Sequence, residues 1–172
     1  SARSIDQCIE EATADITVTT NLVESRHLAG DKALFSRVIK ATGPENIWPS
    51  REFFSAKLLE QRQRHQKYDD TGHNLEPNIK ESPGGLRDIQ TIGWVAKRHF
   101  GVSTMRALVE HGFLNDHEFQ QLQSGEEHLW RVRYALHLLT GRHEDRLLFE
   151  HQRALAKQFG YTDADSNLAV EQ

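Results

Sequence analysis

Four charged residues flank a glycine pair near the middle of the sequence, where they could bind an anionic group. Lys80 and Glu81 precede the segment 82–85, which ends in Gly84-Gly85, and Arg87 and Asp88 follow it. Pro83 in this segment has no backbone N–H to donate, so a regular element cannot run through it. The paired glycines permit φ > 0 and the close approach of a backbone or a phosphate. A helical pattern begins directly after the glycines, so their amides would favour an anion.

The same segment is also consistent with a structural turn. Pro-Gly-Gly before a helix commonly forms a simple turn, and Arg87 and Asp88 would then be first-turn residues or a buried pair that holds helices together. Apolar side chains can anchor both flanks of the loop; these are Leu75, Ile79, Leu86 and Ile89. Spacing alone leaves both interpretations open.

Other arrangements of chemically active residues give weaker signals. The sequence has ten histidines, but no two lie three or four residues apart, and none is followed directly by Asp. Asp163 and Asp165 have the spacing of a two-metal nucleotidyl-transfer pair, yet they lie in an expected polar loop rather than on a strand. A nucleophile elbow and a Walker loop are also missing from the sequence. We therefore expect neither a catalytic residue nor a metal ligand among these 172 residues.

Composition favours a polar globular protein. Charged residues make up 27% of the chain and hydrophobic residues 37%, and no apolar run is long enough to span a membrane. The net charge of −4 does not indicate a nucleic-acid partner. Cys8 is the single cysteine, which excludes a disulfide framework and fits a reducing cytoplasm.

Apolar spacing predicts an all-α fold. Ser4 and Gln7 form a capping-box pattern before a long or broken helix, although the β-branched run 15–20 could also be a strand. Further helices are expected over 31–42, 49–68, 86–100, 103–111, 116–140 and 149–159. Short Gly- and Pro-containing connections between them indicate an up-and-down bundle with additional short helices and no sheet.

The stretch Glu76-Pro77-Asn78-Ile79-Lys80-Glu81-Ser82-Pro83-Gly84-Gly85-Leu86-Arg87-Asp88-Ile89-Gln90 closely resembles a signature of bacterial PII uridylyltransferase/uridylyl-removing enzymes. Residues 15–31, 129–149 and 151–172 agree with the same family. The related glutamine synthetase adenylyltransferase has a similar Lys-x-x-x-Gly-Gly segment, so the loop alone does not separate the two families. The flanking segments favour the uridylyltransferase.

The resemblance implies a bifunctional enzyme that transfers UMP from UTP to the PII nitrogen-regulatory protein and removes it again. In such enzymes a magnesium-dependent nucleotidyltransferase core precedes a helical domain, which is followed by an HD phosphohydrolase domain and two glutamine-sensing ACT domains. This sequence resembles the helical domain, so we expect a cut-out piece that is inactive alone and needs no cofactor. Residues 1–30 would end the transferase region, 31–160 would form the bundle, and 161–172 would begin the connection to the HD domain.

Two roles for the domain follow from the resemblance. In the first, the central loop closes the nucleotide cleft: Lys80 and Arg87 meet the phosphates with the Gly84-Gly85 amides, while Glu81 and Asp88 orient the cations. In the second, the domain is a non-catalytic docking module for PII or for neighbouring domains. The basic segment 62–67 and the charged segment 142–146 are then the candidate surfaces.

Overall fold

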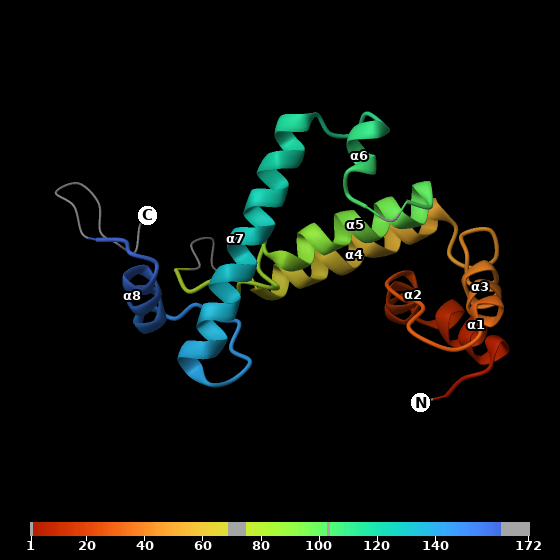
Figure 1. Cartoon of the computed structure of the whole chain (residues 1–172), viewed down its shortest axis with the longest axis horizontal. Coiled ribbons are helices and arrows are strands. Elements are labelled where there is room, and N and C mark those ends of the chain that lie inside the picture. The colour runs from red at the N-terminus through yellow and green to blue at the C-terminus, as the bar shows by residue number, and fades with distance from the viewer. Residues whose placement is uncertain (1, 69–74, 103, 163–172) are drawn as a thin grey trace. The chain divides into compact units, whose positions relative to one another are not determined.

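The computed structural model describes residues 2–68, 75–102 and 104–162, and within them it is all-α (Figure 1). The helices are α1 (Ile5–Ala14), α2 (Ile16–Val23), α3 (Lys32–Ala41), α4 (Ser50–Tyr68), α5 (Leu86–Phe100), α6 (Ala107–Glu110), α7 (Asp116–Thr140) and α8 (Phe149–Gln158). The described residues contain no strand; an isolated antiparallel bridge pairs Asn78 with Arg146. The all-α prediction is confirmed.

Polar side chains fix where the first three helices begin. Ser4 and Gln7 form the predicted capping box at α1. Asp15 accepts a hydrogen bond from the Thr17 amide at 2.7 Å and so starts α2, and Asp31 does the same for α3 through Ala33. Of the two predicted forms of the first helix the broken one is observed, because Asp15 adopts an extended conformation that α1 cannot continue through. The alternative strand over 15–20 is wrong.

The chain divides into two compact units, each made of two separate stretches of sequence. Unit 1 consists of residues 1–61 and 90–116, and unit 2 consists of residues 62–89 and 117–172. The assignment of residues 1–30 to the end of a transferase region stays a prediction. Asp163 and Asp165, with most of the expected connection 161–172, lie outside the described residues.

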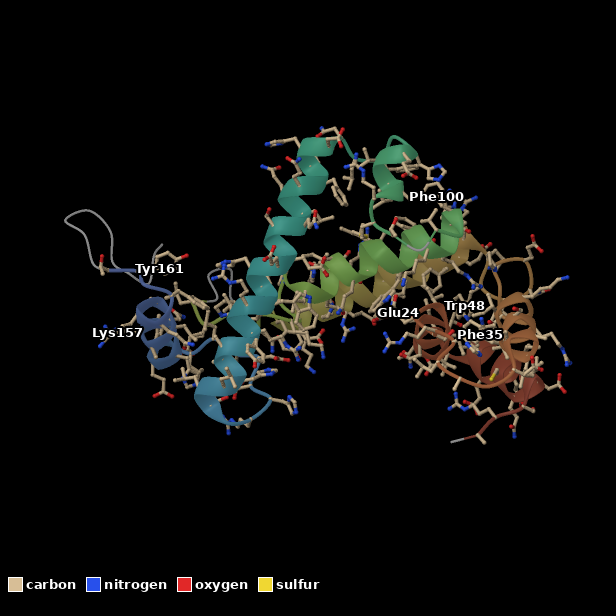
Figure 2. All side chains as sticks on the ribbon, in the orientation of Figure 1. Glu24, Phe35, Trp48, Phe100, Lys157 and Tyr161 are labelled. Atoms are coloured by element: carbon tan, nitrogen blue, oxygen red, sulfur yellow. The ribbon has the colours of Figure 1, made fainter. Side chains whose placement is uncertain are left out.

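The buried cation Arg98 joins distant segments of unit 1. The Arg98 guanidinium on α5 donates to the backbone carbonyls of Thr42, Ile47 and Trp48 in the connection between α3 and α4. Trp48, labelled in Figure 2, has a φ of 43°, which is uncommon for a non-glycine residue, and its indole Nε1 donates to the Ala12 carbonyl at 2.8 Å. Arg98 and Trp48 thereby connect α5 and α1 through the α3–α4 connection.

Unit 2 has its own apolar core. Ile79, Ala135, Leu136 and Leu155 are buried together, which packs the central loop against α7 and α8. Sequence periodicity predicted α7 and α8 almost to the residue, whereas the helix expected over 103–111 is shorter, at Ala107–Glu110. Arg106 at the start of α6 makes no side-chain capping bond, so no cap extends this helix towards its N-terminus. No described helix is long and apolar enough to cross a membrane.

Candidate functional site

Asn78 organises the first half of the central loop. Its side-chain Oδ1 accepts hydrogen bonds from the amides of Lys80 and Glu81 at 3.1 and 2.8 Å. The Asn78 amide in turn donates to the Ser82 hydroxyl, and the Ser82 amide donates back to the Asn78 carbonyl. Asparagine side chains form such turns readily, so Lys80 and Glu81 stand on a fixed backbone.

Gly85 is the point at which the loop folds tightly onto itself. A Cβ at this position would lie 2.8 Å from the carbonyl oxygens of Ile79 and Ser82 and 2.9 Å from that of Lys80. The amides of Leu86 and Arg87 donate to the Ile79 and Lys80 carbonyls, which places the start of α5 directly over the loop. Only glycine fits here without moving the backbone.

Asp145 attaches the loop to α7. Its carbonyl accepts from the Ile79 amide at 2.8 Å. Its carboxylate lies 2.7 Å from Arg133 Nε and 2.9 Å from His137 Nε2. Burial alone would raise the pKa of Asp145, but the hydrogen bonds and charges of Arg133 and His137 outweigh it and hold that pKa below its ordinary value.

Glu81 lies between the cations of the loop. Lys80 Nζ and Arg87 Nη2 are each 3.3 Å from its Oε1, and Arg64 Nε is 3.8 Å from its Oε2. Burial would raise the pKa of Glu81, yet Arg87 and Lys80 lower it below the ordinary value through hydrogen bonds and charge. Glu81 is therefore an anion at neutral pH, and its carboxylate interacts with more than one cation.

Asp88 joins the first turn of α5 to the end of α4. Arg64 Nη2 lies 2.6 Å from Asp88 Oδ1, and His65 Nε2 lies 3.0 Å from both carboxylate oxygens. The Gly84 amide donates to Asp88 Oδ2 at 2.8 Å. The sequence left a buried pair as an alternative role for Asp88, and in the structure Asp88 is largely buried against Arg64 and His65.

The predicted site residues lie together in the central loop and the first turn of α5. Lys80 and Arg87 keep part of their side chains accessible, at 32 and 26%. The Gly84 N–H donates to the Asp88 carboxylate and the Gly85 N–H donates to the Ser82 carbonyl. The two glycines therefore shape the turn, and their amides are already used within it. An anion at this loop would therefore meet the two cationic side chains first.

Sequence reasoning missed Arg64 and His65 as members of this cluster. Cations near the C-terminus of a helix are favoured by the helix dipole, so both looked like a solvated basic end. That interpretation is wrong for Arg64, whose side chain is only 9% exposed. The contacts with Asp88 join residues more than twenty positions apart in sequence, and helical periodicity carries no signal for such pairs.

The second predicted docking surface, segment 142–146, is only partly free. Arg142 pairs with Glu144, and Arg146 pairs with Glu76 at 3.5 Å, whereas Asp145 points towards α7. The Arg142 and Arg146 side chains nevertheless remain 70 and 60% exposed. Within the described ranges, no group of three or more His, Cys, Asp or Glu side chains could hold a metal ion.

The helices and the charged loop define an all-α segment that presents paired cations on a rigid turn. The family described as GlnD PII-uridylyltransferase matches residues 52–172. This chain belongs to the GlnD PII-uridylyltransferase family, which confirms the resemblance and separates it from glutamine synthetase adenylyltransferase.

Curated relatives carry the same description. A "Bifunctional uridylyltransferase/uridylyl-removing enzyme" of Pseudomonas aeruginosa (strain LESB58) is 58% identical over 171 residues, which is 99% of this chain and 19% of the relative. Proteins of the same name from Pseudomonas fluorescens (strain SBW25) and Stutzerimonas stutzeri (strain A1501) are 55 and 54% identical over 99 and 98% of this chain. The chain spans 19% of the length of each. No solved structure matches it.

Proposed function

We propose that this chain is the helical part of a bifunctional enzyme that transfers UMP from UTP to the PII regulatory protein and removes it again. The family match and relatives named uridylyltransferase/uridylyl-removing enzyme support this proposal. The helical part is inactive alone, and glutamine is sensed by other domains of the enzyme. Such an enzyme works in the cytoplasm.

Within that enzyme the central loop forms one wall of the nucleotide cleft. The observation that carries this role is the sharing of one carboxylate oxygen: Lys80 Nζ and Arg87 Nη2 both lie 3.3 Å from Glu81 Oε1. Lys80 and Arg87 thus converge on one carboxylate oxygen while 32 and 26% of their side chains stay accessible, which holds two cations at an ordered, partly accessible position. Such a position favours a triphosphate or a leaving pyrophosphate.

The other predicted residues support these two cations. Glu81 orients Lys80 and Arg87, Asp88 anchors α5 to α4 through Arg64, and Gly85 allows the loop to close. Magnesium is the cofactor that the family resemblance implies for nucleotidyl transfer. The described residues of this chain offer no metal-binding cluster, so this ion would be held by residues elsewhere in the enzyme.

Calorimetric titration of UTP into the full-length enzyme, with magnesium present, tests the cleft role. Lys80→Ala or Arg87→Ala should weaken UTP binding about tenfold or more, since a charge-assisted hydrogen bond contributes about 1.5–3 kcal/mol. Arg62→Ala, an exposed residue on α4, is the matched control and should bind UTP normally. Normal UTP affinity in both loop variants would leave the loop as a structural joint only.

A second candidate function is docking of PII, favoured by the exposure of Arg142 and Arg146. Charged side chains on the rim of an interface mainly affect the association rate. Arg142→Ala and Arg146→Ala should then slow PII association in surface plasmon resonance while UTP affinity stays unchanged. Unchanged association would exclude this surface.

A further inference from the structure

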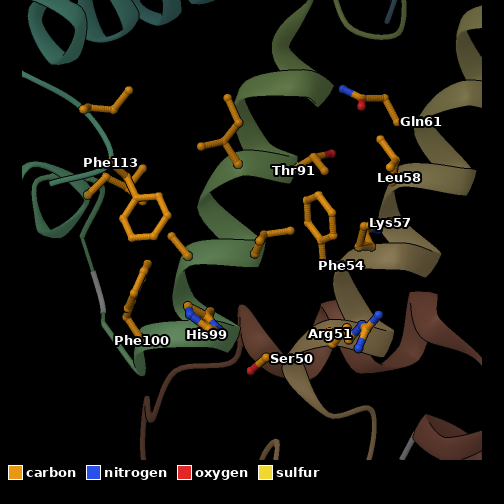
Figure 3. A pocket seen from close by; sticks show the side chains of 15 residues that line it. Ser50, Arg51, Phe54, Lys57, Leu58, Gln61, Thr91, His99, Phe100 and Phe113 are labelled. Carbon is orange, nitrogen blue, oxygen red and sulfur yellow. The ribbon is translucent and has the colours of Figure 1, made fainter. Parts of the chain in front are cut away.

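Unit 1 contains a cavity of about 630 Å³ that the proposed chemistry does not use. We call it the α4–α5 groove. Its apolar lining includes Phe54 and Leu58 on α4, Ile92 and Val95 on α5, and Phe113 beyond α6. Figure 3 shows the Phe54 ring near Thr91, with Phe113 and Leu58 on opposite sides of the cavity.

The groove exposes large apolar side chains to solvent. Phe113 is 63% exposed, Phe54 is 50% exposed and Ile92 is 42% exposed. Exposed apolar side chains gathered in one groove are typical of binding sites. The α4–α5 groove therefore has the character of a binding site.

One end of the groove carries an exposed cation. No carboxylate occurs among the lining residues that the structure describes, whereas Arg51 and Lys57 are among them. Lys57 is buried and bound to Glu60 at 2.7 Å, but Arg51 is exposed, at the same end as Ser50 and His99 (Figure 3). Arg51 therefore favours an occupant with a carboxylate at this end.

The dimensions of the groove fit a helix. Its lining on α4 runs from Ser50 to Gln61, which corresponds to about 16 Å or three helical turns at 1.5 Å per residue. Its walls along α4 and α5 are helix side chains, and the backbone groups beneath them are bonded within those helices. No strand edge is therefore offered for β-augmentation, and side chains must provide the recognition.

We infer that the α4–α5 groove is the docking site for an amphipathic helix from the same polypeptide, outside these 172 residues, whose carboxylates lie at the Arg51 end. The relatives support an occupant within the same chain, because this sequence covers only 19% of their length. A helix in the same polypeptide is present at a high effective concentration and loses little entropy on docking. Apolar contact over three turns is therefore sufficient for binding. The inference rests on family membership and not on the phosphate-binding role of the central loop.

Site-specific photo-crosslinking in the full-length enzyme tests this docking. Phe54→p-benzoylphenylalanine places the reactive group in the groove, and Glu52→p-benzoylphenylalanine, on the opposite and exposed side of α4, is the control. After irradiation, mass spectrometry should find position 54 joined to one helical, carboxylate-containing peptide of the same polypeptide, and position 52 should not give this product. A product that joins two copies, or no product at position 54 above the control, would overturn the proposal.

A charge variant tests the chemistry of the occupant separately. Arg51→Glu, combined with the crosslinker at position 54, should cause loss of the crosslinked product, whereas Arg51→Lys should retain it. Equal yields for both would contradict a carboxylate at this end. Thermal unfolding followed by circular dichroism checks that each variant is folded. Normal UTP affinity in these variants is expected, so failure of the docking proposal can be told from failure of the cleft proposal.

Discussion

Arg64 Nη2 lies 2.6 Å from Asp88 Oδ1, and this contact joins the end of α4 to the first turn of α5 within unit 2. Both side chains are largely buried, and Arg64 also donates through Nη1 to the Glu81 carbonyl at 2.8 Å. One arginine therefore holds both the backbone and a carboxylate of the central loop. The position of Lys80 and Arg87 depends on it indirectly.

Arg64→Ala should destabilise the chain by about 3 kcal/mol, because the largely buried Asp88 carboxylate would lose its arginine partner and the Glu81 carbonyl would lose its donor. Urea denaturation followed by circular dichroism measures this change. The control is Arg62→Ala on the same helix, an exposed position where about 0.5 kcal/mol or less is expected. Equal effects of the two substitutions would show that Arg64 is as dispensable as a surface residue.

Gly85→Ala should cost about 2–3 kcal/mol, since the new methyl group would meet three carbonyl oxygens at less than 3.0 Å. Gly125→Ala is a matched substitution within α7, where nothing lies within 4 Å of the added Cβ. It should instead stabilise the chain by up to about 1 kcal/mol, because alanine is the better helix former. Thermal melts that change in the same direction for both variants would contradict the close packing at Gly85.

Asp145 should make the stability of unit 2 sensitive to acid. Arg133 and His137 hold the pKa of Asp145 below its ordinary value, even though burial opposes them. A carboxyl group with a lowered folded pKa stabilises the protein above its unfolded pKa of about 3.9, and this stabilisation is lost as pH falls through the folded value. Asp145→Asn should therefore be clearly less stable than the unmodified chain at pH 7, and the difference should shrink once the pH falls below about 4 and disappear below the lowered folded pKa of Asp145.

The control for this pH profile is Asp116→Asn. Asp116 pairs with Arg106 in an exposed contact, with side chains 69 and 49% accessible, and such surface pairs contribute little. Its effect on the free energy of unfolding should be small at every pH. A pH-independent penalty for Asp145→Asn would show that its role is steric rather than electrostatic.

Arg98→Ala should destabilise unit 1 by about 3 kcal/mol or more, because hydrogen bonds to charged groups contribute about 1.5–3 kcal/mol each and three carbonyls would lose a donor. Near-UV circular dichroism of the indole groups should also change, since Trp48 is among those acceptors. Lys97→Ala is the neighbouring control: its pair with Glu24 is exposed, so a cost below about 1 kcal/mol is expected. A small effect at Arg98 would mean that the connection 42–48 orders without it.

Local patterns in the sequence were sufficient for most helices. The apolar stripe of α7 and the capping box at Ser4 each depend on neighbours within one or two turns, so they are readable without a structure. Asp15 was harder, because the apolar spacing continues across it while the carboxylate caps a new helix. At Asp15 the capping hydrogen bond, and not the apolar spacing, determines where one helix ends and the next begins.

In the charged loop, the residue types could be read from the sequence, whereas most contacts between them could not. Lys80, Glu81 and Arg87 lie close in sequence, and their association follows from the loop itself. The partners of Asp88 and the attachment of Ile79 to Asp145 involve distant segments that only the folded chain brings together. The internal use of the glycine amides likewise depends on the exact path of the backbone.

The interleaved composition of the two units has a consequence for synthesis on the ribosome. Residues 1–61 of unit 1 emerge before residues 62–89, which belong to unit 2, and the partner stretch 90–116 of unit 1 follows only after these. Those residues must in turn wait for α7 and the bridge between Asn78 and Arg146. A nascent chain that ends between these stretches would therefore leave both units incomplete, and neither unit could finish folding before the other had begun.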